Sequence, residues 1–133
     1  IPVYSEFADF NQFLSLSSAT NPNPQKFSVY KQALASTLTP NFTAAQGTNG
    51  NIDATGLRLL GIVIVNPAAS TADVNVATGA SNGYSLPQPL KVKPGGFAVE
   101  WYGNALATID STHKTLDITG DATTTPQIGL IFG

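Results

Sequence analysis

The single histidine, His113, is the first candidate for chemistry, because Ser111 and Asp110 lie beside it in one short polar run. Serine, histidine and aspartate form nucleophilic triads, in which a third group orients the base and the backbone holds the nucleophile against an oxyanion hole. Neighbours in a turn between strands point in different directions, and no Gly-x-Ser-x-Gly elbow occurs in the chain. We therefore expect His113 to lie in a surface turn.

Carboxylate and amide side chains are the second set of candidates, for metal binding and for acid–base catalysis. Asn49, Asn51 and Asp53 alternate as at the start of a calcium loop, but the glycine and the final acid of an EF-hand are missing. Glu100 and Asp117 are a candidate pair for glycoside hydrolysis, which needs two carboxyl groups about 5–10 Å apart. Such residues also shape turns by bonding their own backbone. We expect a protein that is not an enzyme and has no catalytic residue, metal or cofactor.

The run from 97 to 102 is the best candidate for ligand binding. Alternation along a strand puts three large apolar side chains on one face, Phe97, Val99 and Trp101. The only tryptophan, Trp101, is expected to fill the core. On the other face Tyr102, with Glu100 beside it, is a candidate to stack on a sugar ring, and Tyr84 is a third candidate ligand contact. A core face and an ordinary surface face account for the same pattern.

Composition excludes several classes of protein. A chain of 133 residues is the length of one domain, and its six Lys and Arg against eight Asp and Glu leave no dense basic patch for a phosphate backbone. We therefore expect no nucleic-acid partner. The chain has no 18-residue apolar run, so we expect no membrane span, and it shows no signal peptide. The absence of cysteine rules out a disulfide scaffold and thiolate metal sites.

The first 25 residues differ from the rest of the chain and are predicted to form an apolar arm with a proline linker. Large apolar side chains recur there at three- and four-residue intervals, as on a short helix that Ser5 would cap: Phe7, Phe10, Phe13 and Leu14. Pro22 and Pro24 then end any regular element. Residues 26–133 are predicted to form a single β-sandwich domain.

Short apolar runs separated by turn residues fill this domain. They predict strands over residues 26–38, 57–66, 72–78, 90–93, 97–102, 105–110, 114–119 and 127–132. Within the first of these, residues 32–35 fit a helix equally well. Residues 39–56 are predicted to be a long polar connection. The pattern predicts an all-β fold, an antiparallel β-sandwich or jelly-roll-like barrel of seven to eight strands, preceded by a short helical or extended arm.

The strand predicted over residues 57–66 is apolar on both of its faces. One face reads Leu57, Leu59, Gly61, Val63 and Val65, and the other includes Leu60, Ile62 and Ile64. An antiparallel sheet normally exposes one polar face to water, so something must cover the second face. The candidates are the apolar arm, a subunit interface, or the long loop over residues 39–56.

A series of strand and turn motifs extends from Leu59 to Gly133. A strand ending at Asn66 leads through an Ala/Ser-rich turn to the alternating strand at 72–76, and residues 90–97 contain a Pro-Gly-Gly turn. The closing strand at 127–132 follows a Gly/Asp/Thr loop. This order, with a composition free of Cys and Met and poor in charge, resembles the small β-sandwich structural proteins of bacteriophage virions: decoration, vertex, and minor capsid or tail-associated proteins.

The resemblance implies a non-enzymatic protein of the virion, an extracellular particle, that folds as a jelly roll or Ig-like sandwich. Its partners would be further copies of itself and other virion proteins of the capsid or tail. The residues also indicate association, because exchange of an apolar arm between identical subunits is a low-cost route to a homo-oligomer. The expected contacts are Phe7, Phe10, Phe13 and Leu14. The alternative is a carbohydrate- or receptor-binding β-sandwich module that uses Tyr84, Glu100 and Tyr102; a hydrolase using Glu100 with Asp117 ranks third.

Overall fold

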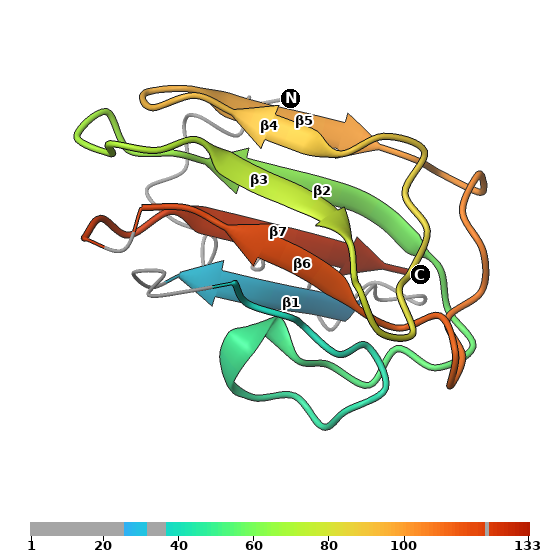
Figure 1. The fold of residues 1–133 in the computed structure, drawn as a ribbon. Coiled ribbons are helices and arrows are strands. Elements are labelled where there is room, and N and C mark those ends of the chain that lie inside the picture. The colour runs from blue at the N-terminus through green and yellow to red at the C-terminus, as the bar shows by residue number, and fades with distance from the viewer. Residues whose placement is uncertain (1–25, 32–36, 122) are drawn as a thin grey trace, which may run out of the picture.

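Two antiparallel β-sheets face each other in the computed structural model, which describes residues 26–31, 37–121 and 123–133 (Figure 1). The four-stranded sheet has the order β1-β7-β2-β5, and the three-stranded sheet has the order β4-β3-β6. The strands are β1 (Lys26–Lys31), β2 (Leu59–Val65), β3 (Val74–Thr78), β4 (Leu90–Val92), β5 (Phe97–Trp101), β6 (Leu116–Thr119) and β7 (Gln127–Phe132). The predicted all-β sandwich is confirmed.

Strand β2 lies inside the four-stranded sheet, between β7 and β5. Its side chains alternate, so Ile62 and Ile64 point to the inter-sheet core together with their β7 partners Leu130 and Ile128. Gly61, Val63 and Val65 point to the outer face, opposite Trp101, Val99 and Phe97 of β5. The strand is therefore apolar on both faces because it has apolar neighbours on both.

A further segment, residues 38–42, runs beside β6 and extends the three-stranded sheet. Leu38 and Ile118 exchange two backbone hydrogen bonds of 2.8 Å, and Asn41 forms a bridge with Thr115. The Phe42 amide then donates to the Lys114 carbonyl at 2.8 Å. Residues 39–42 of this segment lie in the connection that the sequence predicts to be a polar loop, so the second sheet has an additional, interrupted strand at its β6 edge.

The core between the sheets also takes side chains from the long connection. Phe42 is fully buried, with its ring edge-on to Tyr84 at a centroid distance of 5.9 Å and to Phe132 at 4.9 Å. Ile52 and Ala54, which follow a 3₁₀ helix (Thr48–Gly50) and flank the residue that forms a bridge with Thr43, join the same core. Residues 39–56 are thus structural, and they pack into the core rather than over the outer face of β2.

The predicted strand over residues 105–110 is wrong. Leu106 and Ile109 of this segment are buried, which produces the apolar pattern, but the backbone is an irregular loop. The Ile109 amide donates to the Leu57 carbonyl, and the Ile109 carbonyl accepts from the Gly56 amide, while the Ala105 amide donates to the Tyr102 carbonyl across a turn. These are isolated hydrogen bonds and not the ladder of a strand. The other predicted strands are present, most of them one to four residues shorter.

The predicted arm, with Phe7, Phe10, Phe13 and Leu14, lies outside the described residues. The single domain over residues 26–133 stays a prediction. Among the residues that the structure describes, no helix is long and apolar enough to cross a membrane.

Four turns in the described ranges share one Asx-x-Thr arrangement. In each, a carboxylate or amide oxygen accepts hydrogen bonds from both the backbone amide and the hydroxyl of the threonine two residues on. The pairs are Asn41–Thr43, Asp53–Thr55, Asp110–Thr112 and Asp121–Thr123. Asp53, one of the calcium-loop candidates, therefore shapes a turn by hydrogen-bonding nearby residues, as expected.

Asp121 also connects two loops. Its carboxylate accepts two hydrogen bonds from Thr123, at 2.7 Å each, and two from Thr71, at 2.6 and 3.0 Å. The side chain is buried, and the donors stabilise its anion, so the pKa of Asp121 lies well below its ordinary value. The loop after β2 and the loop before β7 are therefore held together by one carboxylate.

We predict that Asp121→Asn lowers the melting temperature at neutral pH, because an amide offers one acceptor oxygen to four donors. A folded-state pKa below the ordinary value of 3.8 means that the carboxylate stabilises the fold above about pH 4 and loses this effect as pH falls. The variant should therefore show a shallower loss of stability between about pH 4 and pH 2. Asp117→Asn is the control, since Asp117 accepts one side-chain hydrogen bond, from Thr39. Equal acid profiles for Asp121→Asn and wild type would contradict the assignment.

Candidate functional site

His113 lies in an exposed turn, as predicted. Its Nδ1 is 2.9 Å from Asp110 Oδ1, and the backbone of the two residues forms a bridge across the turn. The Asp110 carboxylate accepts a hydrogen bond from the Thr112 amide and another from His113. These bonds, the first more than the second, lower the pKa of Asp110 to about 2. The Asp110 carboxylate therefore stabilises the turn. The side-chain hydrogen bonds of this cluster join Asp110, Thr112 and His113 to one another.

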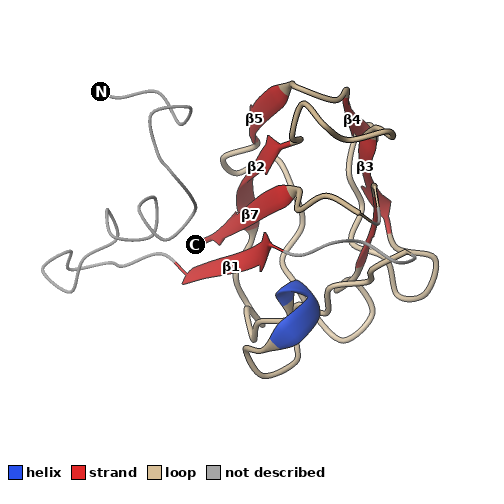
Figure 2. Cartoon of the chain, turned by 90° about the vertical axis from the view of Figure 1, so that its left-hand side faces the viewer, coloured by secondary structure: helices blue, strands red, loops and turns tan. Residues whose placement is uncertain are grey.

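Glu100 and Asp117 are not brought together. Glu100 lies on β5, the edge strand of one sheet, and Asp117 lies on β6 in the other sheet. Strand β5 faces β4 (Figure 2), whereas β6 lies in front of β7 (Figure 1). Asp117 instead accepts a hydrogen bond from Thr39 at 3.1 Å. In the described ranges no three His, Cys, Asp or Glu residues gather as a metal site would require.

The outer face of the four-stranded sheet is the first candidate site. Its edge strand β5 presents three exposed large apolar side chains: Phe97 (46% exposed), Val99 (39%) and Trp101 (56%). Cross-strand pairing puts them beside Val65, Val63 and Gly61 of β2. Edge strands with a free hydrogen-bonding side and an apolar face favour association with another chain. We call this surface the outer apolar face.

The expectation that Trp101 fills the core is wrong. Alternation does place it with Phe97 and Val99, but that face of β5 points away from the second sheet. The indole lies across Gly61 on the neighbouring strand, where a Cβ atom would come within 2.6 Å of Trp101 Cε3. Glycine at this position therefore lets the ring rest flat on the sheet.

The register places a complete row of residues across this face. Phe27 of β1 pairs with Ile131 of β7, which pairs with Gly61 of β2, which pairs with Trp101 of β5. Ile131 is buried, although it points away from the inter-sheet core. The row begins one residue after the point where residues 1–25 join β1.

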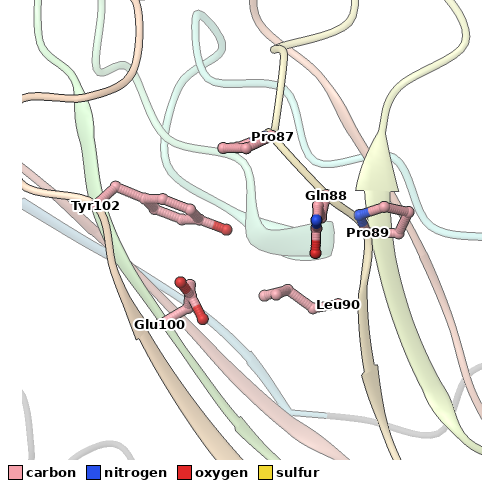
Figure 3. A pocket seen from close by; sticks show the side chains of 6 residues that line it. All are labelled: Pro87, Gln88, Pro89, Leu90, Glu100 and Tyr102. Atoms are coloured by element: carbon pink, nitrogen blue, oxygen red, sulfur yellow. The ribbon is translucent and has the colours of Figure 1, made fainter.

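A cavity at the open edge of the sandwich is the second candidate site (Figure 3). It has a volume of about 170 Å³ and lies between the end of β5 and the segment that leads into β4. The lining residues are Pro87, Gln88, Pro89, Leu90, Glu100 and Tyr102. The structure thus brings together two of the three predicted ligand contacts, and adds a proline-rich wall that no motif in the sequence indicated.

Tyr102 extends the pairing of β5 with β2, because its amide donates to the Leu60 carbonyl at 2.7 Å. Its ring enters the cavity, and Figure 3 shows its hydroxyl pointing toward Gln88. The hydroxyl is buried and has no hydrogen-bond partner among the described residues. Burial, followed by the negative charge of Glu100, raises the pKa of Tyr102 to about 12.

Tyr84, the third predicted ligand contact, is a core residue and does not line the cavity. Its hydroxyl donates to the Ala107 carbonyl at 2.5 Å and accepts from the Leu59 amide at 3.2 Å. Burial raises the pKa of this phenol as well. Tyr84 therefore ties the irregular loop over residues 105–110 to the start of β2.

These two tyrosines give a matched pair of predictions. Tyr102→Phe removes a buried hydroxyl without a partner and should raise the free energy of unfolding by about 1 kcal/mol. Tyr84→Phe leaves the Leu59 amide and the Ala107 carbonyl unsatisfied and should lower it by roughly 1–3 kcal/mol. Chemical denaturation of the two variants measures both effects, and destabilisation by Tyr102→Phe would show that its hydroxyl has a partner.

Comparison with known proteins identifies no relative: no protein-family model, no curated protein and no solved structure matches the chain.

Proposed function

We propose that the chain is a non-enzymatic structural protein of a virus particle, of the kind found in bacteriophages, which self-assembles as a capsid, decoration or vertex component. The observation that carries this proposal is the outer apolar face. Phe97, Val99 and Trp101 lie side by side on an edge strand, exposed to solvent. Burying one such side chain contributes roughly 1.5–3 kcal/mol, so covering all three favours association.

The order of the strands also supports the proposal. Naming the eight segments B to I along the chain, with residues 38–42 as C, gives sheets B-I-D-G and C-H-E-F. This is the strand order of a jelly roll, an architecture used by viral capsid proteins and by lectins. We therefore assign a jelly-roll topology in preference to an Ig-like one.

The partner that we propose for the outer apolar face is a second copy of the chain, including its apolar arm. Residues 1–25 join the sheet at Lys26, beside the row that ends at Trp101. Four strands about 4.8 Å apart make a face roughly 14 Å wide, and 25 extended residues reach up to about 80 Å. The arm is therefore long enough to reach the sheet of a neighbouring copy, where its Phe7, Phe10, Phe13 and Leu14 would find an apolar surface.

We predict that light scattering after size exclusion gives the full chain a mass of three copies or more. Two full-length variants should shift it toward the monomer: Phe97→Ser with Trp101→Ser, and Phe7→Ser with Phe10→Ser and Phe13→Ser. The first removes the exposed rings and the second removes the apolar side of the arm. Electron microscopy of the wild-type assembly should show closed, symmetric particles or rings.

Lys91→Ser is the control, because Lys91 is an exposed residue of β4 in the other sheet. Trp101 is the only tryptophan, so its emission should move to longer wavelength when dilution dissociates the assembly. A monomeric wild-type chain at all concentrations would refute self-assembly. An assembly that both serine variants leave intact would refute this face and this arm as its contacts.

The alternative function, a carbohydrate- or receptor-binding module, is supported by one observation. Glu100 and Tyr102 line the same cavity, and lectins also use the jelly-roll architecture. A glycan array tests it: binding of a glycan by the wild-type chain that is lost in Tyr102→Ala would favour this function. An array without signal would leave the structural proposal as the only one supported.

A further inference from the structure

The cavity at the edge of the sandwich has a wall that is partly apolar and partly polar. Three of its lining residues, Pro87, Pro89 and Leu90, are apolar, and the ring of Tyr102 closes another side. Its polar groups are the Gln88 amide, the Glu100 carboxylate and the Tyr102 hydroxyl. The volume of about 170 Å³ is below the roughly 300–1,000 Å³ of pockets for drug-sized molecules, so any occupant is small or is one side chain.

Glu100 is the only charged residue of this lining, and its charge is uncompensated. It forms no ion pair with any residue that the structure describes; the ion pairs there are Lys91 with Asp73 and His113 with Asp110. Its carboxylate is exposed, so a ligand reaches it without rearrangement of the cavity. Its charge also acts on the neighbouring phenol, because burial, and after it the Glu100 charge, raises the pKa of Tyr102.

We infer that this cavity binds a primary ammonium group on an aliphatic stem, as in the lysine side chain of a partner protein. The ammonium would donate to the Glu100 carboxylate and to the Gln88 carbonyl oxygen, and would lie beside the Tyr102 ring. The methylene stem would lie against Pro87, Pro89 and Leu90. This inference does not rest on the proposed assembly, because these residues are distinct from the outer apolar face.

The charge of the wall favours this ligand over the other classes. An anion would be repelled by Glu100, and among the lining residues no cation offsets that repulsion. A neutral sugar would satisfy hydrogen bonds but leave the carboxylate without a counter-ion. An ammonium supplies three donors and a positive charge, and a cation near the face of an aromatic ring gains further electrostatic attraction.

Titration of the full chain with n-butylammonium chloride tests the inference. NMR of the ¹³C-labelled Leu90 methyl groups is the readout of binding. Five heavy atoms in a shallow site predict saturable binding with a Kd on the order of 1–10 mM. Glu100→Gln should weaken it about tenfold or more, because it removes the charge-assisted hydrogen bond. Asp117→Asn, which makes the same change in net charge on the other sheet, should leave the Kd unchanged.

Two further ligands separate the inferred class from the alternatives. n-Butanol keeps the stem without the charge and should not saturate, and methyl α-D-glucopyranoside represents a sugar. No saturable binding of n-butylammonium, or equal binding to wild type and Glu100→Gln, overturns the inference. Saturable binding of the glucoside alone also overturns it and assigns the cavity to sugars.

If Glu100→Gln does not fold, Gln88→Ala takes its place as the test variant, because Gln88 is an exposed residue of the lining. The same weakening of n-butylammonium binding is expected.

Discussion

The structure depends on the pairing of β2 with β7 on one side and β5 on the other. Ile62 and Ile64 on its inner face fix the core, because their cross-strand partners include Leu130 and Ile128. The same pairing carries Val63 and Gly61 to the outer face and sets β5 beside them. A strand that is apolar on both sides therefore forces its sheet to have an apolar exterior, and β5 is where that exterior remains exposed.

Strand β5 and the residue after it serve both candidate sites. Its odd-numbered side chains form the exposed edge of the outer apolar face, while Glu100 and Tyr102 on the opposite side line the cavity. Side chains alternate along a strand, so a partner on the outer face and a ligand in the cavity need not compete. An edge position makes both possible, because none of the strands that the structure describes lies beyond β5 to cover them.

Polar turns and one irregular loop complete the sandwich. The Asx-x-Thr turns satisfy backbone amides where the chain reverses, and Asp121 joins two loops that are 50 residues apart in the sequence. Phe42, Ile52 and Ala54 join the core from a connection without long strands. The sheets are short, so these loops supply packing that the strands alone do not provide.

Alternation and turn chemistry are local, so the all-β class, the positions of most strands, the two faces of β5 and the turn at His113 could be predicted from the amino-acid sequence. Tertiary structure decided which face of β5 meets the second sheet, and so left Trp101 outside, against the expectation that it fills the core. It also decided that Tyr84 is buried, that Glu100 and Asp117 lie apart, and that Pro87 and Pro89 border Glu100. All of these depend on contacts between segments that are distant in the sequence. Periodicity within a strand shows which side chains share a face, but it does not show which other segment packs against that face.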